Sequence, residues 1–231
     1  MRRRGPDRKR GSIAMLHRSA DDPDALARIA RAAGVTSRRV LDAVRDTRRA
    51  LFVPAVYEDL AYADEPIPLP HGQVTTQPSL SALMVAALDL TGDEEALEVG
   101  TGFGYQTALL ARVAARVVSI EIWADMAEEA RRNLAADGIE NIEVMVGDGT
   151  EGAPAHAPFD AVIVSAAFPE VPPPLVGQLR VGGRLVQPIG PGGREDVVLY
   201  ERAVDGLTRV RILTRASFVP LMGRHGYPRP G

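Results

Sequence analysis

The chain has 231 residues, 45% of them hydrophobic, which is enough sequence to bury one substantial core. It contains no Cys, which excludes a disulfide framework, a thiolate zinc site and a cysteine nucleophile. The first ten residues carry six basic side chains and one acidic one, whereas the other 221 carry 21 basic and 29 acidic ones. An acidic body of this kind is a poor partner for nucleic acid.

The basic head, residues 1–20, is expected to be a disordered tail. Its apolar stretch, residues 13–16, is too short for an export signal. No segment approaches the roughly 20 apolar residues that span a bilayer, so we expect no membrane partner and a cytoplasmic location.

The first part of the body combines helices with one irregular segment. Apolar residues at three- and four-residue spacing predict helices over 23–33 and 37–47, with Pro23 and Ser37 as start signals. Residues 52–78 are rich in Pro and lack periodicity, yet they keep apolar and aromatic side chains, so we expect them to line a site. A further helix is predicted over 79–90.

From residue 93 onward, short β-branched runs alternate with helix-like stretches, which is typical of a parallel sheet covered on both faces. The runs are 96–100, 116–121, 142–148, 159–166 and 183–189, and the helix-like stretches are 105–115, 123–138 and 173–183. Two more strand-like runs around Asp205-Gly206 predict a terminal hairpin. The expected fold is therefore α/β, a doubly wound, mostly parallel seven-stranded sheet with a C-terminal antiparallel hairpin, in which 21–92 and 93–231 form one structural unit.

The first strand of this region ends in a glycine-rich turn, Glu98-Val99-Gly100-Thr101-Gly102-Phe103-Gly104, and a helix follows at once. Glycines allow a sharp turn and let a ligand approach the backbone N–H groups. The spacing is G-x-G-x-G rather than the dinucleotide pattern G-x-G-x-x-G, which favours S-adenosylmethionine over NAD. A generic glycine turn is the alternative.

Two acidic residues end the next two strands. Glu121 follows the glycine turn by about twenty residues, where a carboxylate can accept hydrogen bonds from both ribose hydroxyls, although a surface Glu near a helix start is the alternative. Asp148 ends the third strand and can accept from an adenine amino group, or it can be a turn residue. All three features fall at the carboxyl ends of parallel strands, where open α/β sheets bind ligands.

The glycine turn and several further stretches resemble the protein-L-isoaspartate O-methyltransferase family, from about residue 24 to residue 226. The further stretches are Tyr62-Ala63-Asp64-Glu65-Pro66-Ile67-Pro68, Gly72-Gln73-Val74-Thr75-Thr76-Gln77-Pro78, Val146-Gly147-Asp148-Gly149, Ala157-Pro158-Phe159-Asp160, Gln178-Leu179, Gly182-Gly183-Arg184-Leu185 and Phe218-Val219-Pro220-Leu221-Met222-Gly223. The resemblance implies the class I methyltransferase fold and methyl transfer from S-adenosylmethionine to the free α-carboxylate of L-isoaspartyl residues in damaged proteins, with S-adenosyl-L-homocysteine as product. It also implies that isoaspartyl proteins and peptides are the partners. We expect a monomer and no metal.

In this family the segment 72–78 covers the methyl donor and holds the isoaspartyl carboxylate. The resemblance implies that Thr76 is the catalytic residue, through carboxylate positioning, and that Gln73, Thr76, Gln77, Pro78, Val219, Pro220 and Leu221 bind the substrate. Residues expected at the donor are Val74, Thr75, Thr76, Ser79, Glu98, Gly100, Thr101, Gly102, Gly104, Glu121, Ile122, Asp148 and Gly149.

The segment departs from the family pattern at two positions. Thr76 stands where the family has Ser, so the hydroxyl is kept but an extra methyl enters the carboxylate pocket. Val74 stands where the family has Thr, which removes one hydroxyl. An alternative reading of Thr75 and Thr76 is that they cap the helix beginning at Pro78.

The isoaspartyl carboxylate, with a reference pKa of roughly 3.3–3.7, is ionised at neutral pH, so no general base is needed. Other functions stay open: a methyltransferase for nucleic acid or a small molecule, a relative acting on aspartate in a peptide natural product, or a binding module without turnover. The place of the base-methylating motif reads Ser165-Ala166-Ala167-Phe168-Pro169, which lacks the Asn/Asp-Pro-Pro-aromatic pattern.

Overall fold

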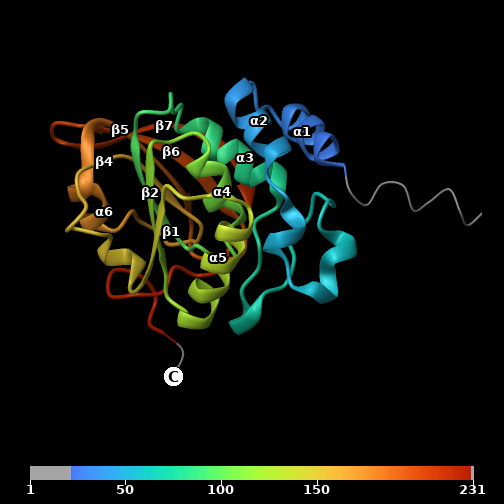
Figure 1. Ribbon diagram of the computed structural model, residues 1–231. Helices are drawn as coiled ribbons and strands as arrows, with labels where there is room; N and C mark the ends of the chain where they lie inside the picture. Colours follow the sequence, from blue (N-terminus) through green and yellow to red (C-terminus); the bar gives the residue numbers. More distant parts are fainter. Residues whose placement is uncertain (1–21, 230–231) are drawn as a thin grey trace, which may run out of the picture.

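Within residues 22–229, which the computed structural model describes, seven strands form one sheet in the order β3-β2-β1-β4-β5-β6-β7 (Figure 1). Neighbours from β3 to β5 are parallel, and β6 and β7 are added as an antiparallel hairpin. The strands are β1 Glu95–Val99, β2 Arg116–Glu121, β3 Ile142–Val146, β4 Phe159–Val164, β5 Leu179–Ile189, β6 Glu195–Ala203 and β7 Gly206–Ala216. The predicted mixed sheet and terminal hairpin are confirmed, whereas the basic head at 1–20 lies outside the described residues.

The helices begin where the sequence supplies start signals. Pro23 occupies the first turn of α1, and the Ser37 hydroxyl accepts a hydrogen bond from the Val40 N–H at the start of α2. The helices are α1 Pro23–Ala32, α2 Arg38–Asp46, α3 Pro78–Ala87, α4 Tyr105–Ala111, α5 Ala124–Ala136 and α6 Pro173–Gln178. Short 3-10 turns η1 Arg49–Phe52, η2 Ala55–Leu60 and η3 Pro70–Gly72 shape the segment predicted to be irregular, and η4 Gly149–Glu151 follows β3.

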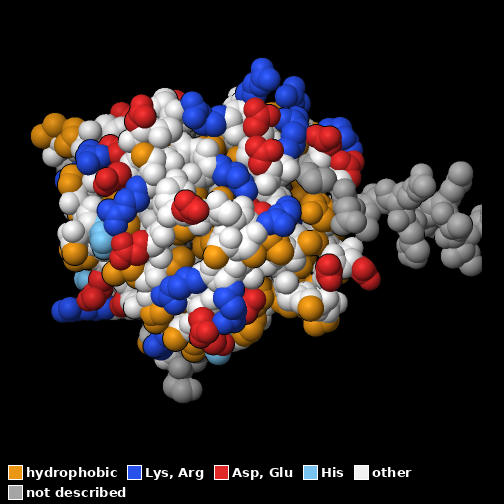
Figure 2. All heavy atoms as spheres, viewed as in Figure 1, with side chains coloured by type: hydrophobic (Ala, Val, Ile, Leu, Met, Phe, Trp, Pro, Cys, Tyr) orange, Lys and Arg blue, Asp and Glu red, His pale blue; other side chains and the backbone are white. Residues whose placement is uncertain are grey.

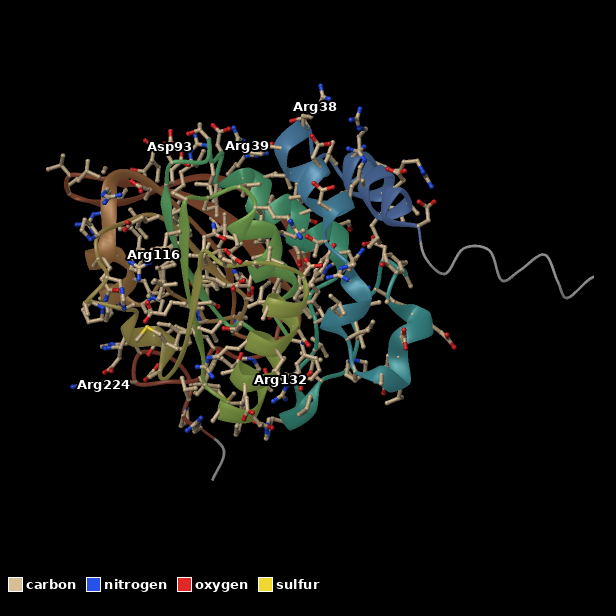
Figure 3. All side chains as sticks on the ribbon, in the orientation of Figure 1. Arg38, Arg39, Asp93, Arg116, Arg132 and Arg224 are labelled. Atoms are coloured by element: carbon tan, nitrogen blue, oxygen red, sulfur yellow. The ribbon has the colours of Figure 1, made fainter. Side chains whose placement is uncertain are left out.

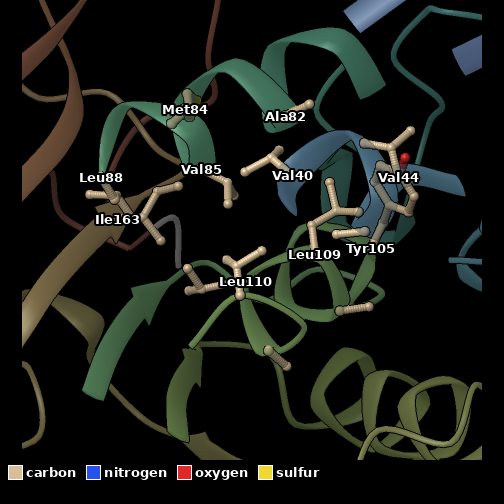
Figure 4. Close-up of a cluster of buried hydrophobic side chains, with 14 of the residues drawn as sticks. Val40, Val44, Ala82, Met84, Val85, Leu88, Tyr105, Leu109, Leu110 and Ile163 are labelled. Carbon is tan, nitrogen blue, oxygen red and sulfur yellow. The ribbon is translucent and has the colours of Figure 1, made fainter. Parts of the chain in front are cut away.

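The sheet is covered on both faces because its strands are apolar on both sides. Along β1, Ala96 belongs to the cluster that the sheet shares with α1 to α5, and the next residue, Leu97, belongs to the cluster on the α6 face. Figure 4 shows the first cluster, where Val85 of α3 points toward Leu110 of α4, and Leu88, just after α3, lies beside Ile163 of β4. The two clusters hold the strands in fixed register, so their carboxyl ends form a stable edge.

The helix predicted over 173–183 is wrong in its second half, because β5 already begins at Leu179. Leu179 is extended (φ −85°, ψ 136°), pairs with Phe159 and is buried on the α6 face. A register shift follows, and a Cβ at Gly183 would lie 2.7 Å from the Asp160 carbonyl oxygen. Apolar spacing predicted a helix here, but pairing with β4 and close backbone approach favour a strand.

The surface of the described residues mixes charges of both signs. Arg116 pairs with Glu143 across 2.9 Å, and Arg132 of α5 pairs with Glu128 across 2.7 Å; Figure 3 labels both arginines. Figure 2 shows the same interspersion of basic and acidic side chains over one face. No helix among residues 22–229 is long and apolar enough to cross a membrane.

Candidate active site

A pocket with about 850 Å³ of empty space, part of it open to solvent, lies at the carboxyl ends of β1, β2 and β4. Its walls come from the irregular segment, the glycine turn with the start of α4, the ends of β2 and β4, and the stretch after β7. The lining residues are Phe52, Leu69, Gln73, Val74, Thr75, Thr76, Ser81, residues 99–106, Ile120, Glu121, Ile122, Met126, Gly149, Ser165, Ala166 and residues 219–222. Several residues of the segment 52–78, which was predicted to line a site, therefore line this pocket.

The glycine turn follows β1 and forms one wall of this pocket. Gly100, Gly102 and Gly104 have φ values of 93°, 58° and 98°, a region that side chains with a Cβ rarely adopt. At Gly104 a Cβ would also lie 3.3 Å from the Leu134 side chain. The turn thus brings backbone atoms, rather than side chains, to the pocket surface, which suits close approach of a ligand.

Glu121, at the end of β2, is 4% exposed and lines the pocket beside this turn. Its Oε2 accepts a hydrogen bond from the Gly102 N–H at 2.8 Å, and its Oε1 accepts from the Trp123 N–H at 3.1 Å. Burial raises the pKa of the carboxyl, and the two N–H donors oppose that rise. A carboxylate has about four acceptor sites, so Glu121 can still accept from a diol such as a ribose. The turn and this carboxylate together fit an adenosyl ligand.

Glu98, one strand position before the turn, does not line the pocket. Its fully buried carboxyl accepts hydrogen bonds from Thr107 Oγ1 at 2.5 Å, Ser119 Oγ at 2.7 Å and Gln106 Nε2 at 3.0 Å. Burial raises its pKa to about 7, despite the three donors. In the structure Glu98 links β1 to β2 and α4 behind the turn, so any effect of Glu98 on a bound methyl donor would be indirect.

The segment 72–78, called the lid from here on because the resemblance predicts that it covers the methyl donor, contributes two threonines with different environments. The buried Thr75 hydroxyl accepts from the Ile67 N–H at 2.9 Å and from Arg49 Nη2 at 3.3 Å. The neighbouring Thr76 side chain is half-buried and lines the pocket, and its hydroxyl makes no hydrogen bond with any other described residue. Thr76 therefore keeps its hydroxyl for a ligand, whereas Thr75 anchors the lid.

The next residues of the lid turn away from the pocket, toward Asp64. Ser79 donates to Asp64 through both its N–H and its hydroxyl at 2.8 Å, and Gln77 Nε2 donates to the same carboxylate at 2.7 Å. Asp64 thus supplies the hydrogen bonds at the start of α3, and the alternative reading in which Thr75 and Thr76 cap that helix is wrong.

The stretch after β7 forms the opposite wall. Val219 and Leu221 exchange backbone hydrogen bonds of 2.8 Å with Ala167, which follows β4, and the buried Glu195 accepts from the Phe218 N–H at 2.9 Å. These bonds hold 219–222 against the sheet edge, where they line the pocket together with the lid.

Asp148 is occupied by the same C-terminal stretch. Its carboxylate accepts from the Thr150 N–H and hydroxyl at 2.9 and 2.6 Å and from the Arg224 N–H at 2.7 Å. Burial alone would raise its pKa, but the donors from Thr150 and Arg224 outweigh burial and the pKa lies below its usual value. In the structure Asp148 therefore acts as a turn residue, which was the alternative to binding an adenine. Its side chain is not among those that line the pocket.

A second groove, with about 1,030 Å³ of empty space including open solvent, continues the mouth of the pocket. The two share Gln73, Val219, Pro220 and Met222. Its rim carries Trp123, which stacks on His71 with ring centroids 4.0 Å apart. Where it meets this groove, the pocket is therefore open to a peptide chain that lies across the surface.

The structure brings most predicted site residues together and leaves five outside the pocket lining. Residues in the lining are Gln73, Val74, Thr75, Thr76, Gly100, Thr101, Gly102, Gly104, Glu121, Ile122, Gly149, Val219, Pro220 and Leu221. Gln77, Ser79, Glu98 and Asp148 bond to other side chains or backbone groups of the chain, and Pro78 begins α3. Lining residues that the sequence did not indicate include Ser81, Tyr105, Gln106, Met126 and Ser165.

Comparison with known proteins agrees with this geometry. The family model for protein-L-isoaspartate(D-aspartate) O-methyltransferase matches residues 21–226. The protein-L-isoaspartate O-methyltransferase of Methanoculleus marisnigri is 48% identical over 85% of this chain and 89% of its own length. That of Anaeromyxobacter dehalogenans is 50% identical over 81% of this chain and 91% of its own.

Solved structures give the same result. A protein-L-isoaspartate O-methyltransferase with 29% identity superposes with a TM-score of 0.77, covering 88% of this chain and 67% of the other. The fold is shared with a putative enzyme of this type from Plasmodium falciparum, in complex with S-adenosyl-L-homocysteine, with 21% identity, a TM-score of 0.72 and coverage of 87% and 98%. With the glycine turn, the lid and the 219–222 wall meeting around one pocket, this chain belongs to the protein-L-isoaspartate(D-aspartate) O-methyltransferase family.

Proposed function

We propose that this chain transfers a methyl group from S-adenosylmethionine to the free α-carboxylate of L-isoaspartyl residues in damaged proteins and peptides. One observation carries the proposal: Thr76, the glycine turn, Glu121 and the 219–222 wall line a single pocket whose mouth opens onto a surface groove. A donor and a peptide acceptor can therefore meet there. The relatives' names supply the acceptor class.

On the donor side, backbone groups of Gly100 and Gly102 and the carboxylate of Glu121 would hold the adenosyl portion. S-adenosylmethionine, when bound, supplies a methyl group on a cationic sulfur. The part of this chain is to fix the position of that group and to keep water from it: Thr101 and Ile122 lie in the pocket wall, and Thr101 is almost fully buried.

On the acceptor side, Thr76 would position the carboxylate by a hydrogen bond from its hydroxyl, and Gln73 with 219–221 would hold the adjoining peptide. Because that carboxylate is ionised at neutral pH, no residue of the chain has to remove a proton. Alignment of reacting groups accounts for several kcal/mol of barrier lowering, about 7–11 in ideal cases. We therefore assign Thr76 to positioning.

The test uses two peptides that differ only in Asp against isoAsp, incubated with S-adenosylmethionine labelled in its methyl group. We expect alkali-labile label, released as methanol, with the isoAsp peptide alone. Equal transfer to both peptides, or to neither, contradicts the proposal. A relative acting on aspartate in a peptide natural product would methylate the Asp peptide, and a binding module would methylate neither. The monomeric state and the cytoplasmic location stay predictions.

A further inference from the structure

His71 lies at the tip of a short hairpin that carries the first part of the lid. Pro68 and Val74 form an antiparallel bridge, and the Leu69 N–H donates to the Gln73 carbonyl oxygen at 2.8 Å. His71 itself has φ 58° and ψ 25°, in the left-handed region that residues other than Gly rarely adopt. Such a backbone conformation persists only where the surrounding structure holds it, so the contacts of the His71 side chain matter.

The His71 ring makes two contacts with the segment that follows β2. It stacks on Trp123 with ring centroids 4.0 Å apart and ring planes 7° from parallel. Its Nε2 lies 2.9 and 3.0 Å from the two carboxylate oxygens of Asp125, in the first turn of α5. This hydrogen bond lowers the pKa of the Asp125 carboxyl, which is therefore ionised at neutral pH and accepts from Nε2. We call His71, Trp123 and Asp125 the latch.

The latch joins the two parts of the pocket that would enclose the methyl donor. The lid begins directly after His71, and its Val74 side chain lines the pocket. Trp123 follows the pocket-lining Ile122, and its N–H donates at 3.1 Å to the carboxylate of Glu121, the group proposed for the ribose. Separation of His71 from Trp123 would therefore release the lid beside the adenosyl portion.

The other end of the hairpin is held from the interior. The buried Thr75 hydroxyl accepts hydrogen bonds from the Ile67 N–H and from Arg49. The latch lies at the surface instead, where the side chains of His71 and Asp125 are 33% and 63% exposed. Exposed ion pairs and ring stacks each change an equilibrium by about two- to tenfold, so the latch can open while the buried end stays in place.

We propose that the latch holds the lid closed over the methyl donor, so that His71 is a positioning residue and opening of the latch sets the rate at which donor and product exchange. The assignment rests on the proposed function. A group that only binds the donor slows its release with little effect on its entry, whereas a gate slows both steps. The association and dissociation rate constants therefore distinguish a latch from a binding contact.

The experiment measures both rate constants for S-adenosyl-L-homocysteine by surface plasmon resonance on the immobilised protein. His71→Asn removes the stack but tolerates the left-handed backbone, and we expect it to raise both constants about fivefold to tenfold. The dissociation constant, which is their ratio, should stay within about twofold. Asp125→Asn keeps the stack and loses the ion pair, so both constants should rise about twofold to threefold.

Trp123 gives a second readout, because it is the one Trp in the chain and its emission reports the contact with the His71 ring. His71→Asn should change that emission in the ligand-free protein. The matched control is His156→Asn, since His156 pairs with Glu143 across 3.5 Å and lines neither the pocket nor the surface groove. The control should change neither rate constant and leave the emission as it is.

Faster dissociation with unchanged association would make His71 a binding contact and overturn the latch. Unchanged rate constants in His71→Asn and Asp125→Asn would overturn it as well, and so would unchanged Trp123 emission in His71→Asn. Failure of the wild type to bind S-adenosyl-L-homocysteine would instead overturn the proposed function, and the role of the latch with it.

Discussion

Arg49 donates a hydrogen bond to the Thr75 hydroxyl across 3.3 Å, and the guanidinium that does so is fully buried. The same group donates to the carbonyl oxygens of Ala61, Ala63 and Glu65 at 2.6 to 3.1 Å. Burial lowers the pKa of Arg49, and Tyr105, Asp64 and Glu65 oppose that change, but an arginine remains charged in proteins. The buried Arg49 guanidinium thus binds residues 61–65 of the irregular segment and, through Thr75, anchors the lid.

Arg49→Met should therefore lower the free energy of unfolding by about 3–5 kcal/mol, since three carbonyl oxygens, that of Ala61 buried, and the buried Thr75 hydroxyl lose their donor. Urea denaturation measures the loss, and hydrogen exchange should speed up first in residues 61–67. Arg38→Met, at a side chain that is 92% exposed, is the control and should change stability little. A loss no larger than that of the control would show that Arg49 does not organise the lid.

Thr76→Ala should reduce kcat/KM for an isoAsp peptide by about tenfold to a hundredfold, because the carboxylate loses its positioning hydroxyl. Affinity for S-adenosyl-L-homocysteine, measured by calorimetry, should stay within about twofold, since the donor is held mainly by other groups. Thr76→Ser keeps the hydroxyl without the methyl and should match or exceed the wild type. Wild-type turnover by Thr76→Ala would rule out the positioning role.

Glu121→Gln should weaken S-adenosyl-L-homocysteine binding by about ten- to a hundredfold, because hydrogen bonds to a carboxylate are stronger than those to a neutral amide. Calorimetry of both proteins gives the ratio. The matched control is Glu128→Gln on α5, whose side chain is 68% exposed in an ion pair with Arg132. Equal affinities for Glu121→Gln and the wild type would place the ribose elsewhere.

Glu98 should make stability depend on pH. Its pKa rises from 4.5 to about 7 on folding, so between these values the folded state holds the proton more tightly than the unfolded state. Stability from Glu98 is therefore greatest at low pH and declines as pH rises from about 4.5 to 7, by about 3 kcal/mol in total. Denaturation of wild type and Glu98→Gln at a series of pH values should show a steeper decline in the wild type, because Glu121, whose pKa burial also raises, is present in both proteins; parallel curves would contradict the prediction.

The fold could be predicted largely because its signals are local and repeated. The β-branched runs at 116–121 and 159–164 are short, apolar on both sides and separated by helical stretches, so they indicate a parallel sheet. The start of β5 could not be predicted in this way, because Leu179 becomes extended through pairing with Phe159, a residue twenty positions away. Spacing within one segment carries no information about such a partner.

The site residues show the same difference between local signals, which can be predicted, and long-range contacts, which cannot. The glycine turn and Glu121 were predictable since their function depends on backbone conformation and strand ends, which spacing reveals. Ser79 and Asp148 were expected at the ligand, but Asp64 and Arg224 compete for their polar groups, and the sequence does not show that competition. Ser81 and Tyr105 lie on helix faces, where no local signal distinguishes a pocket from the core.

The two halves of the pocket have separate origins along the chain. Residues 99–106 and 120–122 come from consecutive strand ends, whereas the opposite walls, 73–76 and 219–222, come from remote segments fastened by Arg49 and by Ala167. Substitutions in those remote segments can therefore alter which molecule receives the methyl group without disturbing its source. Evolution, or a protein engineer, can diversify one half while the other is inherited intact.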